Sequence, residues 1–169
     1  MTENDLTRIV GKYRKDIYRL ALCYMKNTAD ADDVTQDAFL KLYTSGLTFL
    51  IDEEAKAWLI RTAANRCKDL LRSHWYKFSE PLDYEMQAPE SEDGEEDLLG
   101  AVMSLPRKTR TVLYMYYYEE YPVKEIAEIT GCTETAVTSQ LWRGRKRLKE
   151  LLKKTDLTEK RSELCDGLQ

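Results

Sequence analysis

The sequence has few histidines and cysteines, the side chains that bind zinc most often. It contains one histidine, His74, and four cysteines, Cys23, Cys67, Cys132 and Cys165, which form no Cys-x-x-Cys pair. A zinc site would need ligands brought together from distant parts of the chain. There is also no glycine-rich phosphate loop and no cysteine–histidine pair at a plausible spacing. We therefore expect a protein that is not an enzyme, has no cofactor or bound metal, and keeps its thiols reduced and mostly buried.

Long apolar runs are missing as well. No stretch of about 18 uncharged apolar residues occurs, so we expect no helix that spans a membrane. The first five residues are polar and acidic, without the basic segment and apolar core of a signal peptide, which favours the cytoplasm. The 169 residues suffice for one medium-sized domain or two small ones.

Basic residues are absent from one segment, and this changes the meaning of the net charge. The formal net charge is −4, but residues 79–104 hold nine acidic residues and no lysine or arginine. Outside that segment, 26 basic residues outnumber 21 acidic ones. The acidic character is therefore local, and the net charge does not exclude a nucleic-acid partner.

Apolar residues recur at three- and four-residue spacing along residues 1–78, which predicts three amphipathic helices. The first has a buried stripe of Leu6, Ile9, Val10, Tyr13, Ile17, Leu20, Ala21 and Tyr24. The second, capped by Asn27 or Thr28, has an apolar stripe of Val34, Ala38 and Leu42 and is broken by Ser45 and Gly46. The third begins with Asp52 as its N-cap and runs to about Trp75. Its apolar face is Leu59, Ile60, Ala63, Cys67, Leu70 and Leu71, and its polar face is Arg61, Asn65, Lys68, Asp69 and Arg72.

Residues 79–96 differ in composition from the segments on either side. They are acidic, contain Pro81, Pro89 and Gly94, and have few large apolar side chains. Such a segment cannot bury enough surface to offset its ordering entropy, so we expect a flexible linker. Helical patterns resume over residues 97–154, and a polar tail follows over residues 155–169. The predicted fold is all-α, with two small helical domains joined by the acidic linker.

Residues 122–145 (PVKEIAEITGCTETAVTSQLWRGR) predict a helix-turn-helix. Pro122 suits a first helical turn, Gly131 suits the positive φ of a tight turn, and Thr133 can cap the second helix. The second helix has a predicted buried face of Val137, Leu141, Leu148 and Leu151. Its outward positions are Glu134, Thr135, Thr138, Ser139, Trp142 and Arg143, followed by the basic residues Arg145, Lys146, Arg147, Lys149, Lys153 and Lys154. A solvated helix end also favours basic residues, but it does not explain the glycine turn and the small residues before them.

Three motifs in succession resemble the extracytoplasmic-function (group IV) sigma factors of the sigma-70 family. Residues 30–43 (DADDVTQDAFLKLY) are similar to region 2.2, and residues 58–72 (WLIRTAANRCKDLLR) to regions 2.3 and 2.4. Residues 105–110 (LPRKTR) with the helix-turn-helix are similar to region 4. The resemblance implies a subunit of bacterial RNA polymerase that directs initiation at promoters, and the order of the motifs makes it specific.

The resemblance also implies a role for each surface. Candidate residues for docking on core polymerase are Asp33, Gln36, Asp37, Phe39 and Leu40. Candidates for the −10 element are Arg61, Asn65, Lys68, Asp69, Arg72 and Trp75, and the loop 44–51 corresponds to a segment that captures a flipped base in the family. Candidates for the −35 element are Thr135, Thr138, Ser139, Trp142, Arg143, Arg145, Lys146 and Arg147. The sequence departs from the family at Thr138 and Gln140, where basic residues are frequent, so it does not predict the −35 sequence.

Regulation and two competing interpretations remain open on sequence grounds. Many members of the family are held by an anti-sigma factor, which makes such a protein an expected partner besides core polymerase and promoter DNA. One alternative is a free-standing helix-turn-helix regulator, although no sustained dimerisation heptad is present. The other is an adaptor whose two helical domains bind proteins only, which would give interactions with weak salt dependence.

Overall fold

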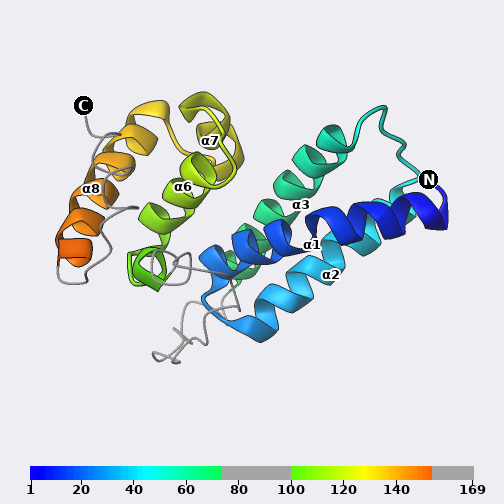
Figure 1. Ribbon diagram of the computed structural model, residues 1–169, viewed down its shortest axis with the longest axis horizontal. Coiled ribbons are helices and arrows are strands. Elements are labelled where there is room, and N and C mark those ends of the chain that lie inside the picture. Colours follow the sequence, from blue (N-terminus) through cyan, green and yellow to red (C-terminus); the bar gives the residue numbers. More distant parts are fainter. Residues whose placement is uncertain (74–99, 154–169) are drawn as a thin grey trace. The chain divides into compact units, whose positions relative to one another are not determined.

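The computed structural model describes residues 1–73 and 100–153, and these residues form helices and their connections without any strand (Figure 1). The chain divides into two compact units, Met1–Met86 and Gln87–Gln169. The all-α prediction is confirmed. The predicted linker over residues 79–96, Trp75 and the predicted tail over residues 155–169 lie outside the described residues. Within the described ranges, no helix is long and apolar enough to cross a membrane.

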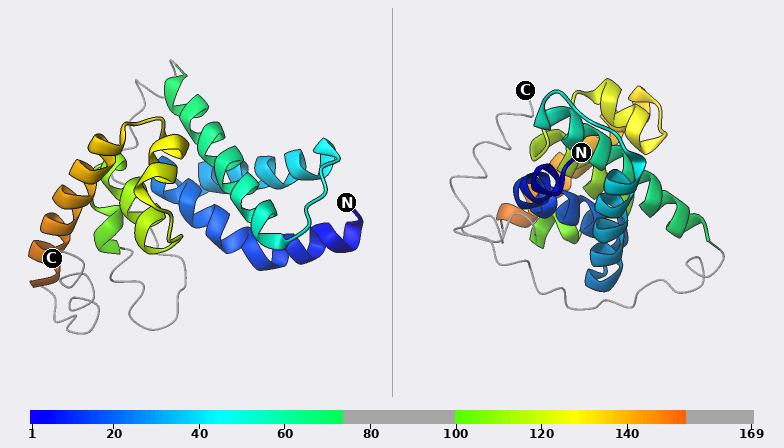
Figure 2. Two further views of the ribbon diagram at one scale, coloured as in Figure 1. Left: turned by 90° about the horizontal axis from the view of Figure 1, so that it is seen from above. Right: turned by 90° about the vertical axis from the view of Figure 1, so that its right-hand side faces the viewer.

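The first unit is built from three helices, α1 (Glu3–Met25), α2 (Thr28–Ser45) and α3 (Asp52–Arg72). Each helix packs against the other two, as the two views of Figure 2 show. The predicted stripes form the core, although Leu6 and Val10 near the start of α1 and Leu70 and Leu71 near the end of α3 are only half-buried. The largest fully buried side chains of this unit are Ile17, Leu20, Leu22, Met25, Leu42, Leu59 and Ile60.

Local hydrogen bonds decide where these helices begin. The Asn27 side chain accepts a hydrogen bond from the Asp30 backbone N–H at 3.0 Å, so Asn27 is the cap of α2. The prediction that Asp52 caps α3 was wrong: Ile51 holds the cap position and makes no side-chain cap bond. Asp52 is the first helical residue, and its carboxylate binds two basic side chains of α1 instead. The helix ends at Arg72, with Ser73 as its C-cap.

The second unit contains the predicted helix-turn-helix. A helical turn over residues 100–103 precedes α6 (Arg107–Tyr117), and α7 (Val123–Thr130) and α8 (Glu134–Lys153) follow. Gly131 ends α7 with φ of 76°, and the Thr133 hydroxyl accepts a hydrogen bond from the Ala136 N–H at 3.1 Å. Both features match the sequence prediction. Pro122 lies just before the first residue of α7.

The buried face of α8 differs from the prediction at two positions. Leu152 is buried where Leu151 was expected, because four residues after Leu148 return closer to the same face of a helix than three residues do. Gly144 is buried as well, at a close approach between α8 and α6. A Cβ atom added there would lie 2.5 Å from Leu113 Cδ1 and 2.8 Å from Thr109 Cγ2, so the contact requires glycine.

The cysteines follow the prediction only in the first unit. Cys23 and Cys67 are buried, but Cys132 is exposed, because it lies in the turn that follows Gly131. Cys165 lies outside the described residues. Across residues 1–73 and 100–153, no group of three or more His, Cys, Asp or Glu side chains could hold a metal ion.

Candidate nucleic-acid and protein interfaces

An exposed stripe runs along α2 and combines acidic with apolar side chains. Asp33, Gln36, Asp37 and Leu40 all point to solvent, and the Leu40 side chain is 61% exposed. Asp37 is not free, because it accepts a hydrogen bond from Arg66 Nε of α3 at 3.0 Å. A helix with this mixture of side chains suits a partner helix that is basic and amphipathic.

Two neighbours change the predicted composition of the stripe. Phe39, a predicted docking residue, is only 8% exposed and packs in the core of the first unit, because it lies next to Ala38 on the inner side of α2. Tyr43 is 46% exposed and extends the stripe one turn beyond Leu40. Its spacing of three residues from Leu40 is the signal by which the sequence could have revealed it. We define the α2 stripe as Asp33, Gln36, Asp37, Leu40 and Tyr43.

The polar face of α3 is arranged as predicted. Arg61, Asn65, Asp69 and Arg72 are exposed along one side of the helix, and Lys68 beside them is half-buried. Arg72 lies 3.8 Å from Asp69, a pair of exposed side chains one turn apart. Trp75, the remaining candidate of this group, lies outside the described residues. The described part presents three cations, one amide and one carboxylate along the helix, and the cations and the amide suit a nucleic-acid strand.

The loop between α2 and α3 exposes apolar side chains. Its residues 46–51 include Leu47, Leu50 and Ile51, which are 41%, 96% and 55% exposed. Phe49 is half-buried, and the centre of its ring lies 6.5 Å from that of Trp58, which is also half-buried. The exposed apolar groups can pack against unpaired bases.

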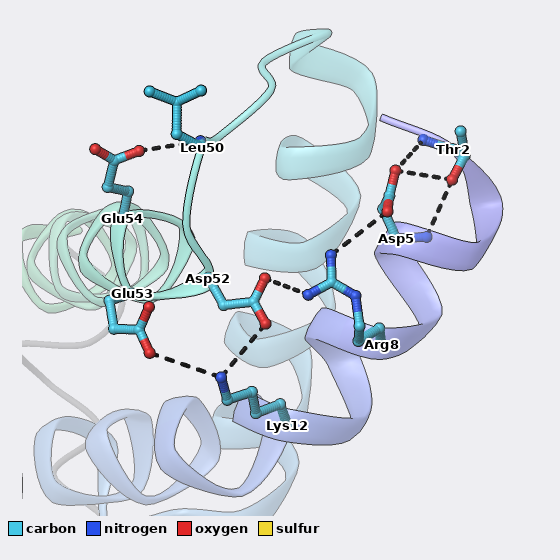
Figure 3. Close-up of polar contacts among 8 residues, drawn as sticks. All are labelled: Thr2, Asp5, Arg8, Lys12, Leu50, Asp52, Glu53 and Glu54. Carbon is cyan, nitrogen blue, oxygen red and sulfur yellow. Dashed lines mark hydrogen bonds and ion pairs between the residues drawn. The ribbon is translucent and has the colours of Figure 1, made fainter.

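A network of charged residues joins the base of this loop to α1 (Figure 3). The two Asp52 oxygens accept hydrogen bonds from Arg8 and from Lys12 Nζ, the latter at 3.3 Å. The hydrogen bond from Arg8 lowers the pKa of the Asp52 carboxyl and raises the pKa of the Arg8 guanidinium. Asp5, held by Thr2 in a capping box and 3.4 Å from Arg8, also has a lowered pKa, for which the hydrogen bond from the Thr2 side chain is the main cause.

In the second unit, α8 presents an outward face that includes most of the predicted residues. Thr135, Thr138, Ser139, Trp142, Arg143, Lys146 and Arg147 are all exposed. The Trp142 side chain is 59% exposed, and Lys146 Nζ lies 5.3 Å from the centre of its ring. Arg147 pairs with Glu150 at 3.3 Å. Small side chains at the start of the helix allow close approach to a groove, and the cations that follow can reach phosphates.

Two residues of α8 turn away from this face. Arg145 donates from Nε to the Tyr117 hydroxyl and lies 5.3 Å from the ring centre of Tyr116, so the second unit already engages its guanidinium. Gln140 is half-buried, and its Oε1 accepts a hydrogen bond from the Thr109 hydroxyl at 2.7 Å. The departure from the family at Gln140 therefore falls at a contact with α6, and the departure at Thr138 falls on the exposed face.

Both units match models of one protein family. Residues 9–76 match the model of sigma-70 region 2, and residues 95–148 match that of sigma-70 region 4. The RNA polymerase sigma factor SigV of Bacillus subtilis is 30% identical over 160 residues, which cover 93% of this chain and 96% of SigV. The chain belongs to the sigma-70 family, in its extracytoplasmic-function (ECF) group. The ECF sigma factor SigW of the same species is also 30% identical, with 86% of this chain and 87% of SigW covered.

Solved sigma-factor structures share the fold. The sigma factor RpoE of Bartonella quintana, in complex with the anti-sigma factor NepR, has a TM-score of 0.70 at 21% identity, over 88% of this chain and 97% of that one. CnrH, in complex with the cytosolic domain of CnrY, has a TM-score of 0.59 at 22% identity, over 91% of each chain. These likenesses agree with the all-α fold of both sigma regions.

Proposed function

We propose that this protein binds core RNA polymerase and directs promoter-specific transcription initiation by recognising −10 and −35 elements. The main support is that one chain contains both sigma regions and that each region exposes a surface suited to nucleic acid. The catalytic site of transcription belongs to the polymerase, so the chain contributes recognition and is not itself an enzyme. Its place of action is then the cytoplasm, where the polymerase and the chromosome are found.

The α2 stripe is the proposed docking surface for the polymerase. Leu40 and Tyr43 offer apolar area, and Asp33 and Asp37 surround it with negative charge. Exposed apolar side chains within a charged rim are typical of protein interfaces. The buried ring of Phe39 supports this surface from below.

The polar face of α3 and the loop 46–51 are the proposed −10 surface. Arg61 and Arg72 can contact phosphates of a separated strand, and Asn65 can hydrogen-bond base edges. The exposed side chains of Leu47, Leu50 and Ile51 would lose their contact with water against unpaired bases. We include Trp75 in this surface because of its position in the sequence alone.

The outward face of α8 is the proposed −35 surface. The exposed side chains of Thr135, Thr138, Ser139 and Trp142 are the proposed readers of base edges in the major groove, and those of Arg143, Lys146 and Arg147 are proposed to contact phosphates. Arg145 has a different part in this proposal from the one predicted: its contacts with Tyr116 and Tyr117 hold α8 on α6.

An anti-sigma factor is the proposed regulator. RpoE was solved with the anti-sigma factor NepR bound to it. The exposed apolar side chains of the α2 stripe and Trp142 offer a protein the area that it would need to cover the polymerase and DNA surfaces.

Run-off transcription with purified bacterial core polymerase tests the proposed function. We expect discrete transcripts from fragments of the source genome only when the protein is present, and their start sites would reveal both promoter elements. Trp142→Ala should reduce the yield, whereas Arg14→Gln, a change at an exposed α1–α2 ion pair, should not. Salt-sensitive binding to duplex DNA without any transcript would favour a free-standing regulator. Partners bound with little salt dependence, and no DNA binding, would favour a protein adaptor.

A further inference from the structure

We propose that Arg8 and Lys12 of α1, through Asp52, are positioning residues for the exposed loop 46–51, and that they determine how sharply this loop discriminates between bases. The part of the inference that concerns bases rests on the proposed function. The part that concerns the position of the loop stands on the geometry alone.

The loop needs an anchor because its own side chains supply little packing. Leu50 is 96% exposed, and Leu47 and Ile51 are also exposed, so burial of these three residues cannot fix the backbone. Two hydrogen bonds to loop N–H groups involve flexible acceptors: Leu47 N–H donates to the Ser45 hydroxyl and Leu50 N–H to the Glu54 carboxylate, both at 3.2 Å. Phe49, the half-buried residue of the loop, packs its ring against that of Trp58.

Space is left beneath the loop where it passes α1. A hollow of about 100 Å³ is lined by Met1, Asp5, Arg8, Ile9, Thr48, Phe49 and Asp52. Because the lining includes both loop and α1 residues, packing between the loop and this helix is incomplete at this point. Charged side chains at the edge of the hollow connect α1 directly to the residue that follows the loop.

The charged network is built to hold the end of the loop. Arg8 and Lys12 are four residues apart on α1, so their side chains extend from the same face. They bind separate oxygens of Asp52, the residue that follows the loop directly, and Lys12 also lies 3.7 Å from Glu53 (Figure 3). Asp5, fixed by its capping box with Thr2, lies on the other side of Arg8 and restricts that side chain. These contacts therefore fix the first residue of α3, where the loop ends, relative to α1.

The effect should be local. Arg8 and Lys12 are about half exposed, at 53% and 48%, and exposed ion pairs contribute little to overall stability. Asp52 is better shielded, with a side chain that is 21% exposed, so its orientation is restricted more than that of a free surface carboxylate. Loss of the network should therefore loosen the loop and leave the core of the unit intact.

Hydrogen exchange of the full chain tests the positioning role without any partner. We expect Asp52→Asn and Arg8→Gln to speed exchange of the amides of residues 47–51 about threefold or more, because local opening becomes easier. The buried middle of α1 should exchange as in the unchanged protein, and Asp52→Glu, which keeps a carboxylate, should restore part of the protection. Arg14→Gln is the matched control, because it removes an interhelical ion pair with Asp32 at the opposite end of α2. Exchange at residues 47–51 that is the same in all these variants would overturn the inference.

Transcription tests the consequence for base discrimination. With core polymerase, Arg8→Gln should lower the ratio of transcripts from a matched promoter to those from single-base −10 variants, while discrimination at the −35 element stays unchanged. Equal discrimination by Arg8→Gln and the unchanged protein would contradict this consequence. If the unchanged protein itself supports no transcription, the proposed function fails, and the exchange experiment still decides the positioning role.

Discussion

The two units position their proposed recognition surfaces by different physical means. In the first unit, ion pairs at the surface join the helices: Arg8 and Lys12 bind Asp52, Lys56 lies 3.4 Å from Asp16, and Arg66 binds Asp37. In the second unit, α8 is held on α6 by the close contact at Gly144, the Thr109–Gln140 hydrogen bond and the stacking of Arg145 on tyrosines. Short-range packing does not depend on salt or pH, whereas exposed ion pairs do. Salt and pH should therefore change the proposed −10 surface under conditions that leave the proposed −35 surface unchanged.

The largest expected effect comes from the packing at Gly144. Gly144→Ala places a Cβ atom against Leu113, which is itself buried, and should destabilise the second unit by about 1–3 kcal/mol. Gly11→Ala is the matched control, because a Cβ atom added at Gly11 in α1 would have no neighbour within 4 Å. This substitution should stabilise the first unit by about 0.5–1 kcal/mol. Chemical denaturation followed by hydrogen exchange assigns each change to its unit. Stabilisation by both substitutions would refute the close contact.

A smaller effect should separate two arginines of α8 that are close in sequence. Arg143→Gln should weaken binding to promoter DNA and reduce the slope of log affinity against log salt by about 0.9, because one phosphate contact is lost. Arg145→Gln should leave this slope unchanged, because its guanidinium is held by the Tyr117 hydroxyl and the ring of Tyr116. Holoenzyme binding measured at several salt concentrations checks both results, and equal slope changes would show that Arg145 also contacts phosphate.

The smallest effect is the pH dependence of the first unit. The pKa of Asp52 is lowered in the folded protein by its hydrogen bond with Arg8. A lowered folded pKa stabilises the protein above the unfolded pKa of about 4, and this contribution is lost as the pH falls through the folded value. Asp52→Asn should therefore lower stability at pH 7 and make little difference below the folded pKa. Denaturation of both proteins at neutral and strongly acidic pH measures this, and a difference that persists in acid would mean that the carboxylate charge is not the cause.

Much of the fold follows from local sequence patterns. The stripes of three- and four-residue spacing, Gly131 and Thr133 predict the helices and the turn of the helix-turn-helix, because these features depend on residues near one another in the chain. The exposed row on α3 and most of the outward face of α8 follow from the same periodicity. The resemblance to the sigma-70 family, visible in three motifs, agrees with the matches of both units.

Contacts between distant parts of the sequence could not be predicted. Asp52, Gln140 and Arg145 have partners 28–44 residues away in sequence, at Arg8, Thr109 and Tyr117, and periodicity contains no information about such contacts. Helix spacing also does not determine which of two adjacent leucines, Leu151 or Leu152, is buried. The burial of Phe39 and the exposure of Cys132 were not predicted for a related reason. Burial depends on the neighbouring helices and turns.

The central claim is that the two units recognise promoter DNA separately. Permanganate footprinting of the complete initiation complex is its most direct test. The unchanged protein with core polymerase should make thymines near −10 reactive. Arg61→Ala with Asn65→Ala should abolish this reactivity while the −35 region stays protected, and Trp142→Ala should lower occupancy of the promoter without changing reactivity per bound complex. If both sets of substitutions reduce occupancy and reactivity in the same proportion, the division of recognition between the two units is wrong.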